Sequence, residues 1–203
     1  MPALLSLLTS LTELVNYLKN GHLPTDHRPF VYGAQLHGLC KSNGDFRPIV
    51  VGCTYRRLVA KVCLRPFIPR LRKLLLPSQV GVSIPLGCEA AVHAARYLMD
   101  QPHNEKVILK FDVKNAFNSI RRDTVLQEAQ KHLPGIYPII WDCYYSKTSL
   151  FHGYFSLDSA TGVQQGNSLS PALFALAIHE VTSKIKVDLK IWYLDDGCIG
   201  GDP

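Results

Sequence analysis

The chain contains 203 residues, which is enough for one or two compact units with a real hydrophobic core. Hydrophobic residues make up 47% of it, which excludes a disordered chain, and no apolar stretch approaches the length of a membrane span. The formal net charge of +6 is compatible with a polyanionic partner, although many basic proteins bind none.

The six cysteines do not indicate a metal site. None of them forms a Cys-x-x-Cys pair, and no histidine lies at zinc-finger spacing. Small buried side chains in a reducing compartment are the simpler interpretation, so we expect an intracellular protein of the nucleus or cytoplasm. The leucine-rich N-terminus lacks a basic region, and Glu13 interrupts its apolar run, which favours an amphipathic helix over a signal peptide.

The first half of the chain is predicted to contain a helix, a hairpin and a basic stretch. Apolar positions three and four residues apart predict a helix over 4–19, which Asn20-Gly21 ends. Residues 36–51 are typical of a β-hairpin with Ser42-Asn43-Gly44-Asp45 at its tip. A basic helix is predicted over 54–64, and residues 65–73 add four further cations around two prolines.

The second half mixes helices and strands without a regular strand–helix–strand repeat. Its predicted elements are, in chain order, a small-residue helix over 88–99, a loop over 101–105, a strand over 106–111, a helix capped by Asp123 that runs to 132, a helix over 139–145, a hairpin over 148–157, a helix that begins at Ser170-Pro171 and runs to about 186, and a strand over 190–194. This irregular mixture predicts an α+β fold rather than a doubly wound sheet.

Three aspartates follow strand-like runs. Asp195 and Asp196 close the run 190–194, and an apolar segment that suits a hairpin return comes after them, while Asp112 closes the run 107–111. Adjacent carboxylates at a strand tip repel each other unless a cation lies beside them. The same residues also suit an ordinary solvated turn and a helix cap, so both interpretations stay open on these residues alone.

Three segments resemble motifs A, B and C of reverse transcriptases, in the right order and with plausible gaps. They are Phe111-Asp112-Val113-Lys114-Asn115-Ala116-Phe117, Gln165-Gly166-Asn167-Ser168-Leu169-Ser170-Pro171 and Tyr193-Leu194-Asp195-Asp196. A fourth segment, which spans 39–49, is similar to the fingers hairpin of the family. The resemblance covers most of the chain from about residue 30 onward, and the non-LTR retrotransposon type is the most similar variety.

The resemblance implies a polymerase fold of the α+β class, in which an antiparallel palm sheet packs on helices and the fingers lie before it and are inserted into it. The implied units are an N-terminal helix with fingers over 1–104, palm with motif A over 105–120, a fingers insertion over 121–157, and palm with motifs B and C over 158–203. The thumb and the later palm segment of the family would be absent from a chain that ends just after motif C.

The resemblance also implies a metal-dependent reaction. Its catalytic residues would be Asp112, Asp195 and Asp196, and its metal ligands these three together with Val113. Two Mg²⁺ ions, or Mn²⁺ in their place, would make the primer 3′-hydroxyl nucleophilic and neutralise the pyrophosphate leaving group. We expect no small-molecule cofactor and no membrane partner.

Five residues are expected to bind the incoming deoxynucleotide. Lys41 and Arg47 flank the hairpin tip and would neutralise its triphosphate. By the same resemblance, the ring of Phe117 would exclude a 2′-hydroxyl, Gln165 would hydrogen-bond the nucleotide or the template, and Gly166 would permit a close backbone approach. The simpler interpretations are solvated turn charges, a core aromatic ring and a polar loop that caps the next helix.

The cations of residues 56–73 are the predicted contacts to template or primer phosphates, because a nucleic-acid groove needs positive charge. They are Arg56, Arg57, Lys61, Arg65, Arg70, Arg72 and Lys73. A plain solvated helix face is the alternative interpretation.

We therefore expect the core of a retroelement RNA-directed DNA polymerase that uses an RNA template, a DNA or RNA primer and dNTPs. The first alternative is a truncated or co-opted copy that binds nucleic acid without catalysis, which metal-dependent primer extension would separate. The second is an RNA-dependent RNA polymerase, against which Tyr193-Leu194-Asp195-Asp196 and Phe117 weigh. The third is a protein-interaction module that uses the leucine-rich N-terminal helix.

Overall fold

The computed structural model describes residues 2–42, 44–101 and 105–203. Its elements are α1 (Pro2–Lys19), α2 (Arg28–Val31), β1 (Ala34–Cys40), β2 (Phe46–Gly52), α3 (Thr54–Leu64), η1 (Arg65–Phe67), α4 (Ile68–Leu75), α5 (Gly87–Met99), β3 (Val107–Asp112), α6 (Ala116–Ser119), α7 (Arg122–His132), η2 (Pro134–Ile136), α8 (Tyr137–Tyr144), β4 (Thr148–His152), β5 (Phe155–Ser159), α9 (Ser170–Ser183), β6 (Leu189–Tyr193) and β7 (Asp196–Gly201). None of the described helices is long and apolar enough to cross a membrane.

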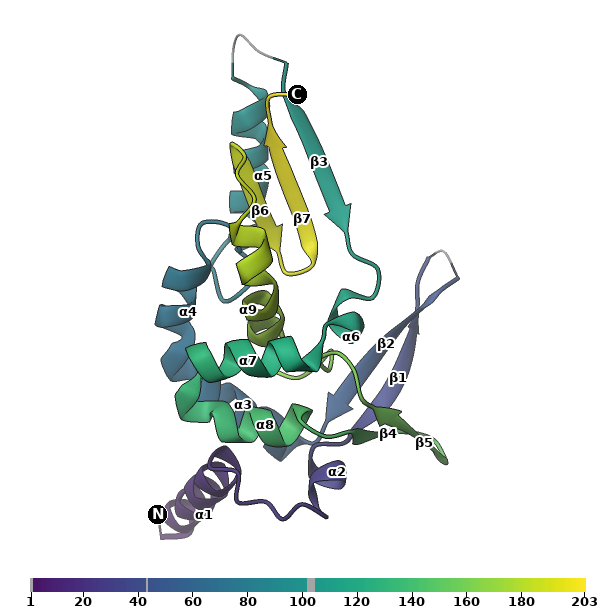
Figure 1. Cartoon of the computed structure of the whole chain (residues 1–203). Coiled ribbons are helices and arrows are strands. Elements are labelled where there is room, and N and C mark those ends of the chain that lie inside the picture. The colour runs from purple at the N-terminus through teal and green to yellow at the C-terminus, as the bar shows by residue number, and fades with distance from the viewer. Residues whose placement is uncertain (1, 43, 102–104) are drawn as a thin grey trace.

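The strands form two separate sheets, which lie at different ends of the molecule (Figure 1). The larger sheet has the order β2-β1-β4-β5, with β1 parallel to β4 and the other pairs antiparallel. Its central pairing joins Ala34 to Leu150 and therefore connects two hairpins that are far apart in the sequence. The smaller sheet has the order β3-β7-β6 and is antiparallel throughout.

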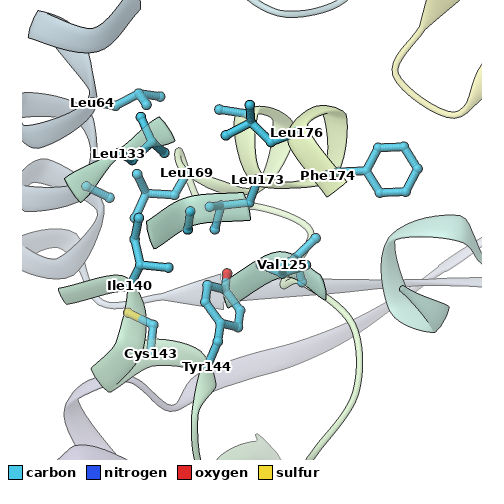
Figure 2. Packing of buried hydrophobic residues seen from close by; sticks show 14 of the residues in the cluster. Leu64, Val125, Leu133, Ile140, Cys143, Tyr144, Leu169, Leu173, Phe174 and Leu176 are labelled. Carbon is cyan, nitrogen blue, oxygen red and sulfur yellow. The ribbon is translucent and has the colours of Figure 1, made fainter. Parts of the chain in front are cut away.

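A helical core connects the two sheets. Helix α9 lies at its centre because its sequence is apolar on most faces, and Leu173 and Leu176 are fully buried there. Figure 2 shows side chains of α3, α7, α8 and α9 filling the space between these helices. Leu133, which follows α7, and Ile140 of α8 are completely enclosed.

The smaller sheet has a core of its own, because α5 covers one of its faces (Figure 1). Leu98 of α5 packs there with Leu189 and Ile191 of β6 and with Val80, which precedes the helix. The sheet that carries the predicted aspartates is thus held by a helix that was predicted from sequence over almost the same residues.

The observed mixture of helices and sheets confirms the predicted α+β class in its coarse form, and helix α3 has the predicted bounds. Two predicted caps are wrong by one or two residues. Asp123 lies inside the first turn of α7 and accepts the Thr124 N–H, and Ser170 is the first residue of α9 and donates to the Gln164 carbonyl. The Leu169 N–H is instead bound by the Asn167 side chain.

Two predicted features lie partly outside the described residues. The loop predicted over 101–105 includes residues 102–104, and the predicted hairpin tip includes residue 43, all of which lie outside the described residues. The hairpin strands on both sides of the tip are present as β1 and β2, which pair from Ala34 and Gly52 to Cys40 and Phe46.

Candidate active site

Strand pairing brings the three predicted aspartates to one edge of the smaller sheet. In the β3–β7 ladder Asp112 lies directly opposite Asp196, and in the β6–β7 hairpin Tyr193 pairs with Asp196. Asp195 therefore occupies the two-residue turn between β6 and β7, next to Leu194, whose φ is +57°. A positive φ is uncommon for a residue with a large side chain such as leucine, and it is tolerated where the surrounding structure fixes the turn.

The carboxylates interact electrostatically. Partial burial raises the pKa of the Asp195 carboxyl, and the negative charges of Asp196 and Asp112 raise it further. A backbone hydrogen bond and the Arg47 guanidinium act in the opposite direction on this pKa. The site thus concentrates negative charge that Arg47 offsets only in part, which is the condition under which a bound cation is stabilising.

A cavity of about 500 Å³ lies between these carboxylates and the β1–β2 hairpin. The hairpin contributes Lys41 and Arg47 to its wall, and the opposite wall contains Asp112, Asp195 and the segment that follows β3. Gln165 also lines it. The structure therefore brings six residues predicted for metal and nucleotide binding to one cavity: Lys41, Arg47, Asp112, Val113, Gln165 and Asp195.

A second cavity of about 690 Å³ adjoins the first and shares Arg47, Asp112, Gln165 and Asp195 with it. Its further lining residues include Arg57, Phe117, Gly166, Tyr193 and Asp196. The two cavities together form a polar cleft that has Lys41, Arg47 and Asp45 on the hairpin side and Asp112, Asp195 and Lys114 on the side of the smaller sheet.

Phe117 combines two of the interpretations that the sequence left open. Its ring is 9% exposed and stacks on Phe174 of α9 at 4.5 Å between ring centroids, as a core aromatic would. It also lines the second cavity. The ring is thus held in one orientation by α9 while one part of it faces the cleft.

Gly166 is required by a close backbone approach, but the neighbouring backbone is that of β2. Its φ is +107°, and a Cβ atom would lie 2.5 Å from the Val50 carbonyl oxygen. The Val50 N–H also donates to the Gln165 carbonyl at 2.9 Å. These contacts attach the loop before α9 to the hairpin and so fix the width of the cleft.

Mg²⁺ prefers hard oxygen ligands and commonly takes one or two carboxylates together with substrate phosphates. Among the described residues, no group of three or more His, Cys, Asp or Glu side chains is arranged to hold a metal ion without further ligands. The donors present are the neighbouring carboxylates of Asp112 and Asp195, with Asp196 beside them. This donor set fits a hard divalent cation whose coordination a substrate completes.

The predicted nucleic-acid contacts are not all brought together. Arg57 lines the second cavity. Lys61, Arg65, Arg70 and Lys73 are exposed but line neither cavity, and helix α4 lies on the side away from β1 and β2 (Figure 1). Arg72 also lines neither, and its Nε donates to the Ser83 carbonyl at 2.6 Å.

The prediction for Arg56 is wrong. Its side chain is 2% exposed, and its Nη1 donates to the Tyr32 carbonyl inside the protein. Arg56 lies on the buried stripe of α3 together with Val59, Ala60 and Cys63. This helical spacing was visible in the sequence and would have indicated that Arg56 faces inward.

The sequence reasoning also missed a residue that holds the site. Gln79 is 4% exposed, and its side-chain amide hydrogen-bonds both backbone groups of Leu194, in the turn that presents Asp195. Lys114, Asn115 and Asn118, in contrast, are expected from the sequence to support Asp112 without taking part in the chemistry, and they line the first cavity beside it. No local pattern marks Gln79, because its partner is 115 positions away.

Comparison with known proteins identifies the family to which this chain belongs. The family model described as reverse transcriptase (RNA-dependent DNA polymerase) matches residues 39–202, so the chain belongs to this family, whose members are nucleotidyltransferases. No curated protein sequence matches the chain.

Solved structures of telomerases share the fold. An apo telomerase from Candida tropicalis truncated from its C-terminal domain matches with a TM-score of 0.61, 16% identity, 86% of this chain covered and 44% of that chain. Another apo telomerase structure from the same organism matches with a TM-score of 0.64 and 14% identity, and the match covers 89% of this chain and 41% of that chain. Telomerase from Candida albicans in complex with a TWJ fragment of telomeric RNA matches with a TM-score of 0.61 and 14% identity, and the match covers 89% of this chain and 38% of that chain. The chain thus spans less than half the length of these structures, and the likeness shows the fold alone.

Proposed function

We propose that the chain is the fingers–palm core of a retroelement reverse transcriptase, which adds dNTPs to a primer 3′-hydroxyl on an RNA template in a two-Mg²⁺ reaction. One observation carries the proposal: a single cavity has Asp112 and Asp195 on one wall and Lys41 and Arg47 on the other. Phosphoryl transfer needs this arrangement, because its protein catalyst mainly positions charge around a triphosphate.

In this proposal the smaller sheet with α5 is the palm, and the larger sheet is the fingers. The pairing of β4 with β1 supports a fingers insertion over 121–157, since both hairpins belong to one sheet. The packing of α5 and Val80 on the smaller sheet favours a palm that also includes these residues, although the boundaries expected from sequence place them with the fingers.

Each predicted residue then has a task that its position supports. Asp112 and Asp195, with Asp196 and the Val113 main chain beside them, would hold divalent cations that activate the primer hydroxyl and neutralise the leaving pyrophosphate. Lys41 and Arg47 bind the triphosphate from the opposite wall, and Arg can do so with two parallel hydrogen bonds. Gln165 orients the nucleotide or the template.

The second cavity extends this task to the sugar and to the nucleic acid. Phe117 lines it beside Gly166, and a ring there excludes a 2′-hydroxyl and so favours dNTPs. Arg57 is the cation best placed to bind template or primer phosphates. We propose that Lys61, Arg65, Arg70, Arg72 and Lys73 bind RNA or DNA phosphates outside the cleft.

The test is extension of a DNA primer on an RNA template by the wild type, by Asp112→Asn and by a control, Asp158→Asn. Asp158 is an exposed aspartate that pairs with Lys147 at 2.7 Å and lines neither cavity, so the control removes the same charge elsewhere. Extension by the wild type and the control only, and with dNTPs rather than NTPs, is the expected result. Template binding without extension by the wild type would instead establish a non-catalytic nucleic-acid-binding protein.

A further inference from the structure

We infer that Gln79 is a positioning residue of the active site, whose side-chain amide holds the turn that presents Asp195; this inference rests on the proposed polymerase function. The Leu194 N–H donates to Gln79 Oε1 at 2.8 Å, and Gln79 Nε2 donates to the Leu194 carbonyl at 3.2 Å. One side chain thus satisfies both backbone groups of a residue that adjoins Asp195. Gln79 lines neither cavity and touches no position assigned to substrate.

The backbone on either side of Gln79 explains why its side chain reaches the turn. Residues 78–80 run parallel to β6: the Trp192 N–H donates to the Ser78 carbonyl at 2.6 Å, and the Val80 N–H donates to the Trp192 carbonyl at 2.8 Å. Two residues beyond Trp192, at Leu194, the Gln79 side-chain amide supplies the hydrogen bonds that a strand residue would otherwise make. It therefore extends the ladder by two hydrogen bonds, from Trp192 to Leu194.

Gly81 makes this arrangement possible. A Cβ atom at this position would lie 2.7 Å from the Leu194 nitrogen and 3.0 Å from Gln79 Oε1, so any side chain would displace the turn or the amide. The Gly81 N–H also donates to Gln79 Oε1 at 3.0 Å. The amide oxygen is therefore held from two sides, and Gln79 is only 4% exposed, which leaves water little access to these hydrogen bonds.

The turn requires such a support. Leu194 has a φ of +57°, a conformation that costs free energy in a residue with a side chain. Asp195 is repelled by Asp112 and Asp196, which favours a turn that moves the carboxylate away from its neighbours. The two hydrogen bonds from Gln79 oppose both tendencies, so the direction of the Asp195 carboxylate depends on a residue 115 positions earlier in the chain.

Two variants of the full chain separate this role from general packing. Gln79→Met keeps the length and volume of the side chain and removes its hydrogen bonds, while Gln79→Glu keeps the acceptor for the Leu194 and Gly81 N–H groups and loses the donor. Arg28→Met is the control for destabilisation alone, because it breaks a 2.9 Å ion pair with the buried Asp142 and lines neither cavity.

The first readout is hydrogen exchange of the Leu194 backbone amide, measured by NMR on the ¹⁵N-labelled chain. We expect at least about tenfold faster exchange in Gln79→Met, because the only acceptor of this N–H among the described residues is lost. Gln79→Glu should lie between Gln79→Met and the wild type, since it keeps the acceptor but turns a carboxyl oxygen toward the Leu194 carbonyl. Arg28→Met should keep near-wild-type protection. Unchanged protection of Leu194 in Gln79→Met would overturn the inference.

The second readout is primer extension at varied Mg²⁺ concentration, normalised to folded protein. Misplacement of a reacting group by about 1 Å costs on the order of a hundredfold in rate, so Gln79→Met should lower kcat by about ten- to a hundredfold and raise the Mg²⁺ requirement, with template–primer affinity unchanged. An equal loss in Arg28→Met would reduce Gln79 to a structural role. Absence of extension by the wild type would refute the proposed function instead, and the exchange of Leu194 would still decide whether Gln79 holds the turn.

Discussion

At the scale of single residues, Asp195 shows how a functional carboxylate acts against stability. Its pKa is raised by burial and by two neighbouring carboxylates, so the folded protein holds a proton at this position more tightly than the unfolded chain does. Without a bound cation, the folded protein is therefore most stable with respect to Asp195 at acidic pH, where this carboxyl is protonated. That stability is lost as the pH rises through the raised pKa, because the repulsion appears when Asp195 ionises.

Replacement of Asp195 by Asn should therefore abolish nucleotide incorporation while raising the thermal midpoint of the metal-free protein. The repulsion with Asp112 and Asp196 is relieved, but water screens much of it, so we expect a gain on the order of 1–3 °C at pH 7. Calorimetry of both proteins at pH 7 and pH 4 measures it, and the difference should shrink at the lower pH. Retained incorporation would remove Asp195 from the metal ligands.

Replacement of Phe117 by Ala should admit ribonucleotides. The stacking on Phe174 is lost as well, so the variant should also be destabilised by about 3–5 kcal/mol, the usual cost of a buried Phe→Ala change. Leu173→Ala is the control, since it removes a fully buried side chain of α9 that lines neither cavity. Selectivity for dATP over ATP should fall in the Phe117→Ala variant only. Equal selectivity in both variants would contradict the proposal that the Phe117 ring excludes a 2′-hydroxyl.

At the scale of elements, helices α7 and α9 are packed together and each places a titratable ring close to that contact. Burial lowers the pKa of His132, which ends α7, and Glu128 at 3.3 Å opposes the shift. The charges of Lys131 and Arg70 and, to a smaller extent, His179 of α9 lower it further. The pKa of His179 is also lowered, mainly by burial. The helical core thus favours two neutral imidazoles.

Acidification should therefore weaken this core. A histidine with a lowered pKa in the folded state contributes stability that is present above its unfolded pKa, about 6.5. This stability is lost as the pH falls from that value through the lowered folded pKa, because the unfolded chain then binds more protons. We expect the thermal midpoint to fall between pH 7 and pH 5 and the double variant His132→Gln, His179→Gln to show a smaller fall. An identical pH dependence of both proteins would exclude the two histidines as its cause.

At the scale of the whole molecule, local pattern predicted the elements but not how distant segments meet. Helix Thr54–Leu64 and both hairpins follow from spacing and turn residues, and the three aspartates follow from the strand runs that they close. Two contacts depend instead on tertiary packing: the parallel pairing of Ala34 with Leu150 and the hydrogen bonds of Gln79 to Leu194. Neither contact produces a periodic pattern in the sequence of the segments that it joins. The charge of Arg56 suggests an exposed side chain, but its position on the apolar stripe of α3 turns it inward.

The width of the cleft depends on one such long-range contact, between Gly166 and Val50. Alanine at position 166 would place its Cβ 2.5 Å from the Val50 carbonyl oxygen, at a φ of +107° that alanine rarely adopts. The β1–β2 hairpin must then move away from the loop before α9. Since Arg47 lies on that hairpin and Asp195 on the smaller sheet, the two walls of the first cavity would lose their spacing.

We therefore expect Gly166→Ala to lower the kcat/KM for dNTP incorporation by at least about tenfold, since small displacements of positioned groups are costly. Gly153→Ala is a matched control: Gly153 also has a positive φ, +59°, but nothing lies within 4 Å of its Cβ position and it lines neither cavity. It should lose about 1–2 kcal/mol of stability from backbone strain and keep its activity. Steady-state incorporation and thermal unfolding of both variants measure the two effects, and equal activity would show that the cleft does not depend on the contact between Gly166 and β2.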